Sequence, residues 1–159
     1  PQNRSMKQIL FLIFFIPAMV SSCSIIKTTQ TTTIQQGISG FVTAVNGNQM
    51  PMKGVESMSP KGLAATIYIY ELTNLSQVTK SNKTGIYTAI QTKRLATIQT
   101  DSLGAFTVAL PVGKYSLFIK TGEAYFANSF DQFNNICLIE VVAGKLANTR
   151  LVMNSAASY

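Results

Sequence analysis

Cysteines and carboxylates are the reactive side chains of this 159-residue sequence, which contains no histidine. A Ser-His-Asp or Cys-His catalytic arrangement and a histidine-based metal site are therefore impossible. The six carboxylates are spread along the chain, and a glycosidase-like pair would need two of them to converge at a cleft. We therefore predict a protein that is not an enzyme and uses no metal or cofactor. A hydrolase with an unusual carboxylate site is the alternative.

The N-terminal segment has the pattern of a signal peptide. Met6 is the expected start, and Lys7 supplies the positive charge that precedes an apolar core. This core, residues 9–20, would form a helix about 18 Å long, against roughly 30 Å of bilayer hydrocarbon. It is too short to span a membrane comfortably and has the length typical of a cleaved leader.

Cys23 ends this segment and follows Val20, Ser21 and Ser22. A processing enzyme needs short side chains just before the bond it cuts, and a cysteine thiolate can accept a lipid. The arrangement resembles the bacterial lipobox, an aliphatic residue and two small residues followed by cysteine. The resemblance implies removal of residues 1–22 and a covalent lipid on Cys23 that anchors the protein to a membrane without spanning it. The alternative is an ordinary secretory signal with an incidental cysteine.

Residues 23–36 would then comprise the lipidated cysteine and a flexible tether. The segment is rich in Thr, Ser and Gln, which build no core, and it could reach roughly 40 Å. A first strand near 31–34 is the alternative. The segments 46–51, 69–73 and 125–128 resemble small Bacteroidetes lipoproteins, in which an acidic run after the cysteine is associated with surface export. Its absence implies the cell envelope, at the periplasmic face of the outer membrane.

Composition favours an all-β domain after the tether. Hydrophobic residues make up 47% of the chain and charged residues only 12%. The net charge is +7, but no run of basic residues exceeds two, so we predict no nucleic-acid partner. Cys137 lies in the apolar run 136–139, and lipidation of Cys23 would leave it without a disulfide partner. We expect Cys137 to be a buried structural thiol.

Short β-type runs separated by turn residues continue to residue 154. We expect an antiparallel sandwich of seven or eight strands, in which 64–72 is central and the last two strands form a hairpin. Residues 46–48 should form a turn, 50–62 a loop, and 73–85 a polar segment with a helical turn near 75–79. The expected strands are 37–45, 64–72, 86–90, 94–100, 105–110, 115–120, 136–142 and 146–153.

Two turns carry local sequence signals. In 101–104, Asp101 can cap its own backbone and Gly104 can adopt positive φ. In 111–114, Pro111 fixes φ early in the turn and Gly113 should relieve backbone strain late in it. Both turns are therefore expected to connect antiparallel strands.

The same turns carry a family resemblance. The pattern T-D-x-x-G-x-F at 100–106, followed by P-x-G-x-Y at 111–115, resembles the carboxypeptidase regulatory-like domain. The resemblance implies a transthyretin-like (prealbumin-like) Greek-key β-sandwich over 37–154, with a short tail at 155–159. It also implies a non-catalytic accessory or interaction module. The sequence departs from the family pattern in a longer loop after the first strand and an insertion at 74–85.

One segment, 123–135, has the composition of a binding loop, because it mixes aromatic rings with amides and a carboxylate. Such a mixture can stack on sugars, grip a peptide or hold Ca²⁺. The alternative is a long loop that folds its own rings onto the edge of the sandwich. We predict an envelope lipoprotein that binds a protein partner, with carbohydrate or peptidoglycan binding by this loop as the alternative. The candidate residues are Tyr125, Phe126, Asn128, Phe130 and Asp131.

Overall fold

The computed structural model describes residues 34–48 and 60–158. The predicted leader, including Val20, Ser21 and Ser22, lies outside the described residues, as do Cys23 and the tether up to residue 33. The described chain consists of strands and one short 3-10 helix, η1 (Leu75–Gln77). The strands are β1 (Gly37–Asn48), β2 (Lys61–Gly62), β3 (Thr66–Glu71), β4 (Val78–Lys80), β5 (Ile86–Ile90), β6 (Arg94–Gln99), β7 (Ala105–Ala109), β8 (Gly113–Thr121), β9 (Ala124–Phe126), β10 (Leu138–Val141) and β11 (Leu146–Ser158).

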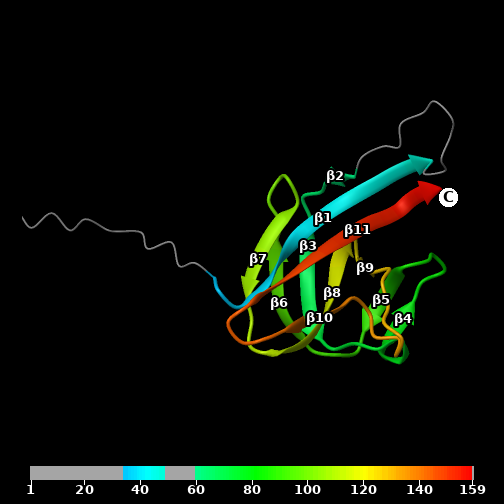
Figure 1. Ribbon diagram of the computed structural model, residues 1–159. Helices are drawn as coiled ribbons and strands as arrows, with labels where there is room; N and C mark the ends of the chain where they lie inside the picture. The colour runs from blue at the N-terminus through cyan, green and yellow to red at the C-terminus, as the bar shows by residue number, and fades with distance from the viewer. Residues whose placement is uncertain (1–33, 49–59, 159) are drawn as a thin grey trace, which may run out of the picture. The chain divides into compact units, whose positions relative to one another are not determined.

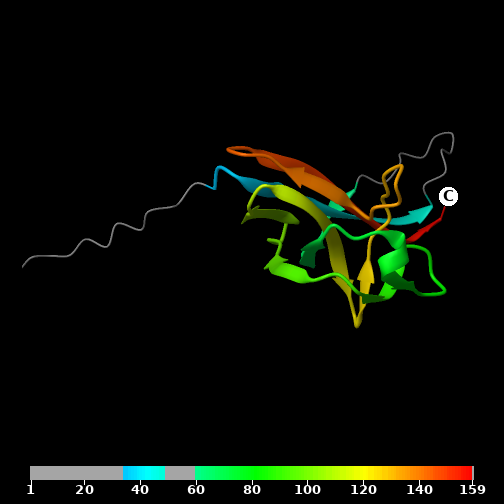
Figure 2. The same cartoon turned by 90° about the horizontal axis from the view of Figure 1, so that it is seen from below.

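These strands form two sheets, and the predicted all-β sandwich is confirmed. The small sheet has the order β11-β1-β2, with β7 also paired to β1. The large sheet has the order β4-β5-β9-β8-β3-β6, with β10 paired to β8, and all its pairs are antiparallel. Figure 2 shows the β1–β11 layer lying over the large sheet. The strand β3 lies between β8 and β6, which confirms the predicted central position of 64–72.

One pair of strands corrects the purely antiparallel expectation. β1 and β11 run parallel, from Gly37 opposite Leu146 to Asn48 opposite Ser158. A parallel pair needs a long connection between its strands, and here the rest of the domain supplies it. The expected turn at 46–48 is therefore wrong, because those residues continue β1. At the other end of the chain, β11 continues past residue 154 to Ser158.

The predicted final hairpin is also wrong. β10 pairs with β8 in the large sheet, whereas β11 pairs with β1 in the small one. The turn at 143–145 thus carries the chain from one sheet to the other. The strands β2, β4 and β9 were not anticipated, and they raise the number of strands in the described part of the chain to eleven. The predicted helical turn near 75–79 is confirmed by η1.

The two turns with local signals behave differently from each other. Asp101 accepts hydrogen bonds from the backbone N–H groups of Leu103 (2.9 Å) and Ala105 (2.8 Å), and Gly104 has φ +82°, as predicted. Gly113, in contrast, is not a positive-φ glycine. A Cβ on Gly113 would lie 3.2 Å from the hydroxyl of Tyr115, so this glycine leaves room for that side chain.

The core lies between the sheets, and a second apolar layer lies on the other face of the large sheet. β8 is buried on both faces, because the small sheet covers one face and aromatic rings cover the other. On that second face, Phe118 makes edge contacts with Tyr70 (5.5 Å), Tyr87 (6.0 Å) and Tyr125 (6.4 Å). The fully buried aliphatic residues between the sheets include Ile38, Val42, Ile67, Ile69, Leu117 and Val141.

Candidate functional site

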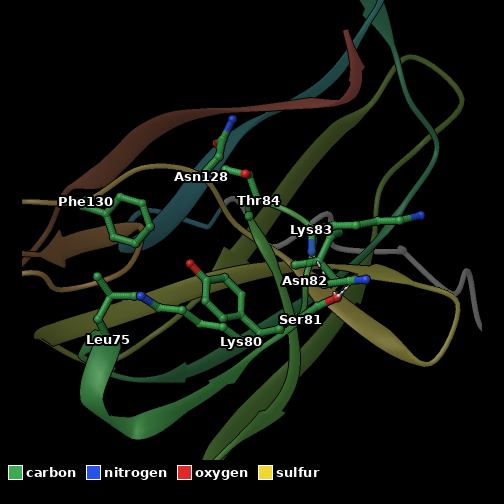
Figure 3. A pocket seen from close by; sticks show the side chains of 11 residues that line it. Leu75, Lys80, Ser81, Asn82, Lys83, Thr84, Asn128 and Phe130 are labelled. Carbon is green, nitrogen blue, oxygen red and sulfur yellow. Dashed lines mark hydrogen bonds between the residues drawn. The ribbon is translucent and has the colours of Figure 1, made fainter.

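A pocket of about 410 Å³ lies between the turn that joins β4 to β5 and the segment that follows β9. It brings together the insertion at 74–85 and part of the predicted binding loop 123–135 (Figure 3). Its lining residues are Leu75, Lys80, Ser81, Asn82, Lys83, Thr84, Gly85, Ile86, Tyr87, Asn128 and Phe130. The pocket therefore joins two segments that the sequence did not connect.

The β4–β5 turn forms the first wall. The backbone N–H of Ser81 donates to the carbonyl of Ile86 (2.9 Å), and the N–H of Ile86 donates to the carbonyl of Lys83 (3.2 Å). Gly85 has φ +73°, and its carbonyl accepts from the N–H of Ala127 (2.9 Å). A Cβ on Gly85 would lie 3.2 Å from the Ala127 carbonyl oxygen, so glycine allows the two segments to approach closely.

The segment 127–136 forms the second wall, and Asn74 holds it in place. Asn74 caps η1 by accepting from the N–H of Ser76 (3.1 Å), and its amide donates to the carbonyl of Phe133 (2.7 Å). The N–H of Leu75 donates to the carbonyl of Asn134 (3.0 Å). These bonds fix Leu75 on one side of the pocket and the residues that follow β9 on the other.

Asp131 stabilises the turn within this wall through hydrogen bonds to its own segment. Its carboxylate accepts from the N–H groups of Phe133 and Asn135 and from the Asn135 side-chain amide, each at 2.8 Å. Desolvation acts to raise the pKa of Asp131, but these hydrogen bonds and the charge of Lys114 together lower it below its usual value. Asp131 therefore folds its own loop and does not line the pocket.

The five predicted loop residues are thus divided among four environments, of which the turn held by Asp131 is one. Phe126 is 2% exposed and belongs to the core, so no ligand can reach it. Tyr125 packs on Tyr68 (5.7 Å between ring centroids) on the outer face of the large sheet. Only Asn128 and Phe130 line the pocket, and the amide nitrogen of Asn128 donates to the carbonyl of Val152 (3.2 Å).

Charge distinguishes the pocket from its surroundings. Lys80 and Lys83 both line it, and no carboxylate is among the described residues that do. Figure 3 shows Lys80 extended toward Leu75 and Phe130, and Lys83 pointing away from them. Phe130 is 47% exposed, so its ring is available to a ligand. The arrangement suits a ligand with an acidic group and an apolar face.

Tyr87 adds an unusual polar group to the pocket. The residue is 3% exposed and lines the pocket, and no hydrogen bond within the described chain involves its hydroxyl. The hydroxyl is not among the buried unpaired atoms of the described residues, which are the hydroxyls of Thr43 and Thr121, so it is accessible from the pocket. Burial and, secondarily, the proximity of Cys137 raise the pKa of Tyr87 above its usual value. Cys137 itself is a buried free thiol, as predicted, and accepts from the hydroxyl of Ser129 (3.4 Å).

The lining residues Leu75, Lys80, Lys83 and Tyr87 were not predicted from the sequence. The one available signal was the polar segment 74–85, which was interpreted from the sequence as an insertion between two strands. Within the described ranges, no group of three or more Cys, Asp or Glu side chains could hold a metal ion, and no helix is long and apolar enough to cross a membrane. No family model, curated protein or solved structure matches this chain.

Proposed function

We propose that this protein is a non-catalytic lipoprotein of the bacterial cell envelope, which presents its β-sandwich to a protein partner. Anchoring through a lipid on Cys23 is supported by the lipobox-like residues Val20, Ser21 and Ser22 and by the leader that precedes them. The turns at 100–106 and 111–115 support a carboxypeptidase regulatory-like module. We place the protein at the periplasmic face of the outer membrane.

The observation that carries this proposal is the point where the chain joins the sandwich. The amide of Gln36 donates to the carbonyl of Leu110 (2.9 Å) and accepts from the N–H of Gly144 (3.1 Å). The chain is thereby held between two turns at one end of the domain, which we name the Gln36 end. The β4–β5 turn lies at the opposite end, the pocket end (Figure 1). A membrane anchor that precedes Gln36 would leave the pocket end free for a partner.

Lipid attachment is tested by growing cells that express the full chain with labelled palmitate. We expect the label on the wild-type protein and on Cys137→Ala, and none on Cys23→Ser. Cys137 is the matched control because it is the second cysteine of the sequence and is buried in the sandwich. Label on the Cys23→Ser protein would contradict the anchor. Digestion of the protein by protease added to intact cells would contradict the periplasmic face.

Partner binding is tested by pull-down from detergent-solubilised envelope. Phe130 and Phe133 are 47% and 68% exposed on the pocket-end wall, and exposed rings are typical anchors of protein interfaces. The double variant Phe130→Ala/Phe133→Ala should lose a partner that the wild type recovers. Leu103→Ala, which truncates a side chain that is 73% exposed in another turn, should keep it. Recovery of no specific partner by the wild type would contradict the proposal.

Carbohydrate binding is a second candidate, because the pocket places a half-exposed ring beside amides and hydroxyls. Phe130, Asn82, Asn128, Ser81 and Thr84 all line it, and such groups match the apolar face and hydroxyl groups of a sugar. In a glycan array, Phe130→Ala should lose binding. Phe133→Ala should retain it, because Phe133 lies on the same segment without lining the pocket. Loss in both variants, or in neither, would contradict a sugar site in this pocket.

A further inference from the structure

We infer that the pocket binds a sugar that carries a carboxylate group. This inference rests on the second candidate function, carbohydrate binding, and adds the chemical class of the sugar. It does not depend on the lipid anchor or on a protein partner. Three properties of the described pocket support it: its charge, the accessible hydroxyl of Tyr87 and its apolar wall.

The charge favours an anion. Lys80 and Lys83 line a pocket in which no lining residue among those described is acidic. Both lysines are exposed, and Lys80 extends toward Leu75 and Phe130, whereas Lys83 points away from them (Figure 3). A charge-assisted hydrogen bond from Lys80 to a carboxylate is stronger than a bond between neutral groups. A carboxylate placed there would complete the pairing of Lys80.

The Tyr87 hydroxyl is available to a ligand. Tyr87 is almost completely buried, and its ring rests against Phe118 with 6.0 Å between centroids. Its hydroxyl forms no hydrogen bond within the described chain and is not among the buried atoms left without a partner, so it is accessible from the pocket. Because Tyr87 lines the pocket, a ligand hydroxyl or carboxylate in the pocket can supply the missing bond.

The apolar wall distinguishes a sugar acid from a simple inorganic anion. Phe130 and Leu75 line the pocket beside Lys80, and Phe130 is half-exposed. Inorganic phosphate has no apolar face to cover these side chains. A pyranose ring has one, together with hydroxyls for Asn82 and Thr84, so a carboxylated sugar matches both the apolar and the polar side chains of the lining.

The test compares two disaccharides that differ by one acidic group. The first is N-acetylglucosamine joined to N-acetylmuramic acid, and the second is N,N′-diacetylchitobiose, which lacks the lactyl carboxylate. Calorimetry on the purified full chain should show binding of the acidic disaccharide about tenfold tighter than of the neutral one, as expected for one charge-assisted bond. Galacturonic acid and galactose form a second pair, and inorganic phosphate tests the anion alone.

Matched variants identify the groups responsible. Lys80→Gln should abolish the preference for the acidic disaccharide, and Lys80→Arg should retain it. Lys93→Gln removes an exposed lysine that does not line the pocket and should leave the preference unchanged. Tyr87→Phe should weaken binding of the acidic disaccharide without lowering the melting temperature, because the ring and its packing remain.

Each possible binding result tests a different part of the proposal. Equal affinity for the acidic and neutral disaccharides would overturn this inference and leave carbohydrate binding intact. Absence of binding to either member of both pairs would overturn the inference and the second candidate function together. Phosphate binding as tight as that of the acidic disaccharide would also overturn the inference, because the pocket would then be a simple anion site. None of these results bears on lipid attachment at Cys23.

Discussion

Each of the two ends of the sandwich contains a buried tyrosine, and the hydrogen bonding of the tyrosine hydroxyl differs between the two ends. At the Gln36 end, Tyr115 is 7% exposed and its hydroxyl donates to the carbonyl of Pro111 (2.8 Å). Gly113 leaves space for that hydroxyl. At the pocket end, Tyr87 is 3% exposed and its hydroxyl has no partner among the described residues.

This difference separates a region that is complete by itself from one that is not. A hydrogen bond such as that of Tyr115 contributes about 0.5–1.5 kcal/mol. The Tyr87 hydroxyl forms no such bond with the described residues, but it is not among their buried unpaired atoms, so it is accessible from the pocket. The pocket end therefore keeps an accessible donor beside two exposed lysines, as does a surface that binds something else.

Phe118→Ala should have the largest effect, because it removes the support of the pocket end. Phe118 is fully buried and contacts the rings of Tyr70, Tyr87 and Tyr125. We expect a loss of about 3–5 kcal/mol in the free energy of unfolding, measured by urea denaturation. The control Phe41→Ala, at a side chain 51% exposed, should change it by about 0.5 kcal/mol or less. Equal losses would show that the second apolar layer is not a core.

Asn74→Ala should have the next largest effect and should loosen only the pocket end. It removes the η1 cap on Ser76 and the hydrogen bond to Phe133, so we expect a loss of about 1–2 kcal/mol. Hydrogen exchange should quicken at the amides of 131–136 and remain unchanged at Tyr115. The control Asn82→Ala should leave both regions unchanged. Uniform quickening across the sandwich would contradict a locally held wall.

Tyr115→Phe should destabilise the protein by about 0.5–1.5 kcal/mol, because it deletes a satisfied hydrogen bond and nothing else. Thermal denaturation measures the loss, and disaccharide binding at the opposite end should not change. A variant as stable as the wild type would mean that the bond to Pro111 contributes nothing, and the contrast between the two tyrosines would then disappear.

The parts of the fold that could be predicted from the sequence are those set by neighbouring residues. The 101–104 turn depends on one carboxylate and one glycine. The strand 105–110 depends on the alternation of buried and exposed side chains, with Phe106 buried and Thr107 exposed. The parallel pairing of β1 with β11 depends on residues more than 100 positions apart. No local pattern in either strand distinguishes a parallel partner from an antiparallel one, so that feature was missed.

The candidate site was only partly predictable for the same reason. Asn128 and Phe130 were identified from the aromatic and amide composition of 123–135, but the short strand β9 went unrecognised. Successive side chains of a strand point to opposite faces, so Tyr125 and Phe126 could not both face a ligand. The other wall was missed because Asn74 holds a segment about 60 residues away, and its hydrogen bonds leave no signal in either stretch of sequence.

Tyr87→Phe should have the smallest effect on stability, and its pH dependence distinguishes it from Tyr115→Phe. Near pH 7 the variant should be as stable as the wild type or slightly more so, because the lost hydroxyl forms no hydrogen bond with the described residues. Burial raises the pKa of Tyr87, so the folded state holds its proton more tightly than the unfolded state, whose tyrosines titrate near 10. Stability is therefore undiminished below about pH 10 and falls as the pH rises through that value toward the folded pKa.

Replacing Tyr87 by Phe removes its share of that alkaline loss. Urea denaturation at pH 8 and pH 11 should show a smaller decrease for the variant than for the wild type. Burial and, secondarily, the Tyr125 hydroxyl raise the pKa of Tyr70 to about 12, so Tyr70 should cause part of the loss in both proteins. An identical decrease in the two proteins would mean that the pKa of Tyr87 is not raised in the folded state. The difference between the two tyrosines would then rest on the hydrogen bond of Tyr115 to Pro111 alone.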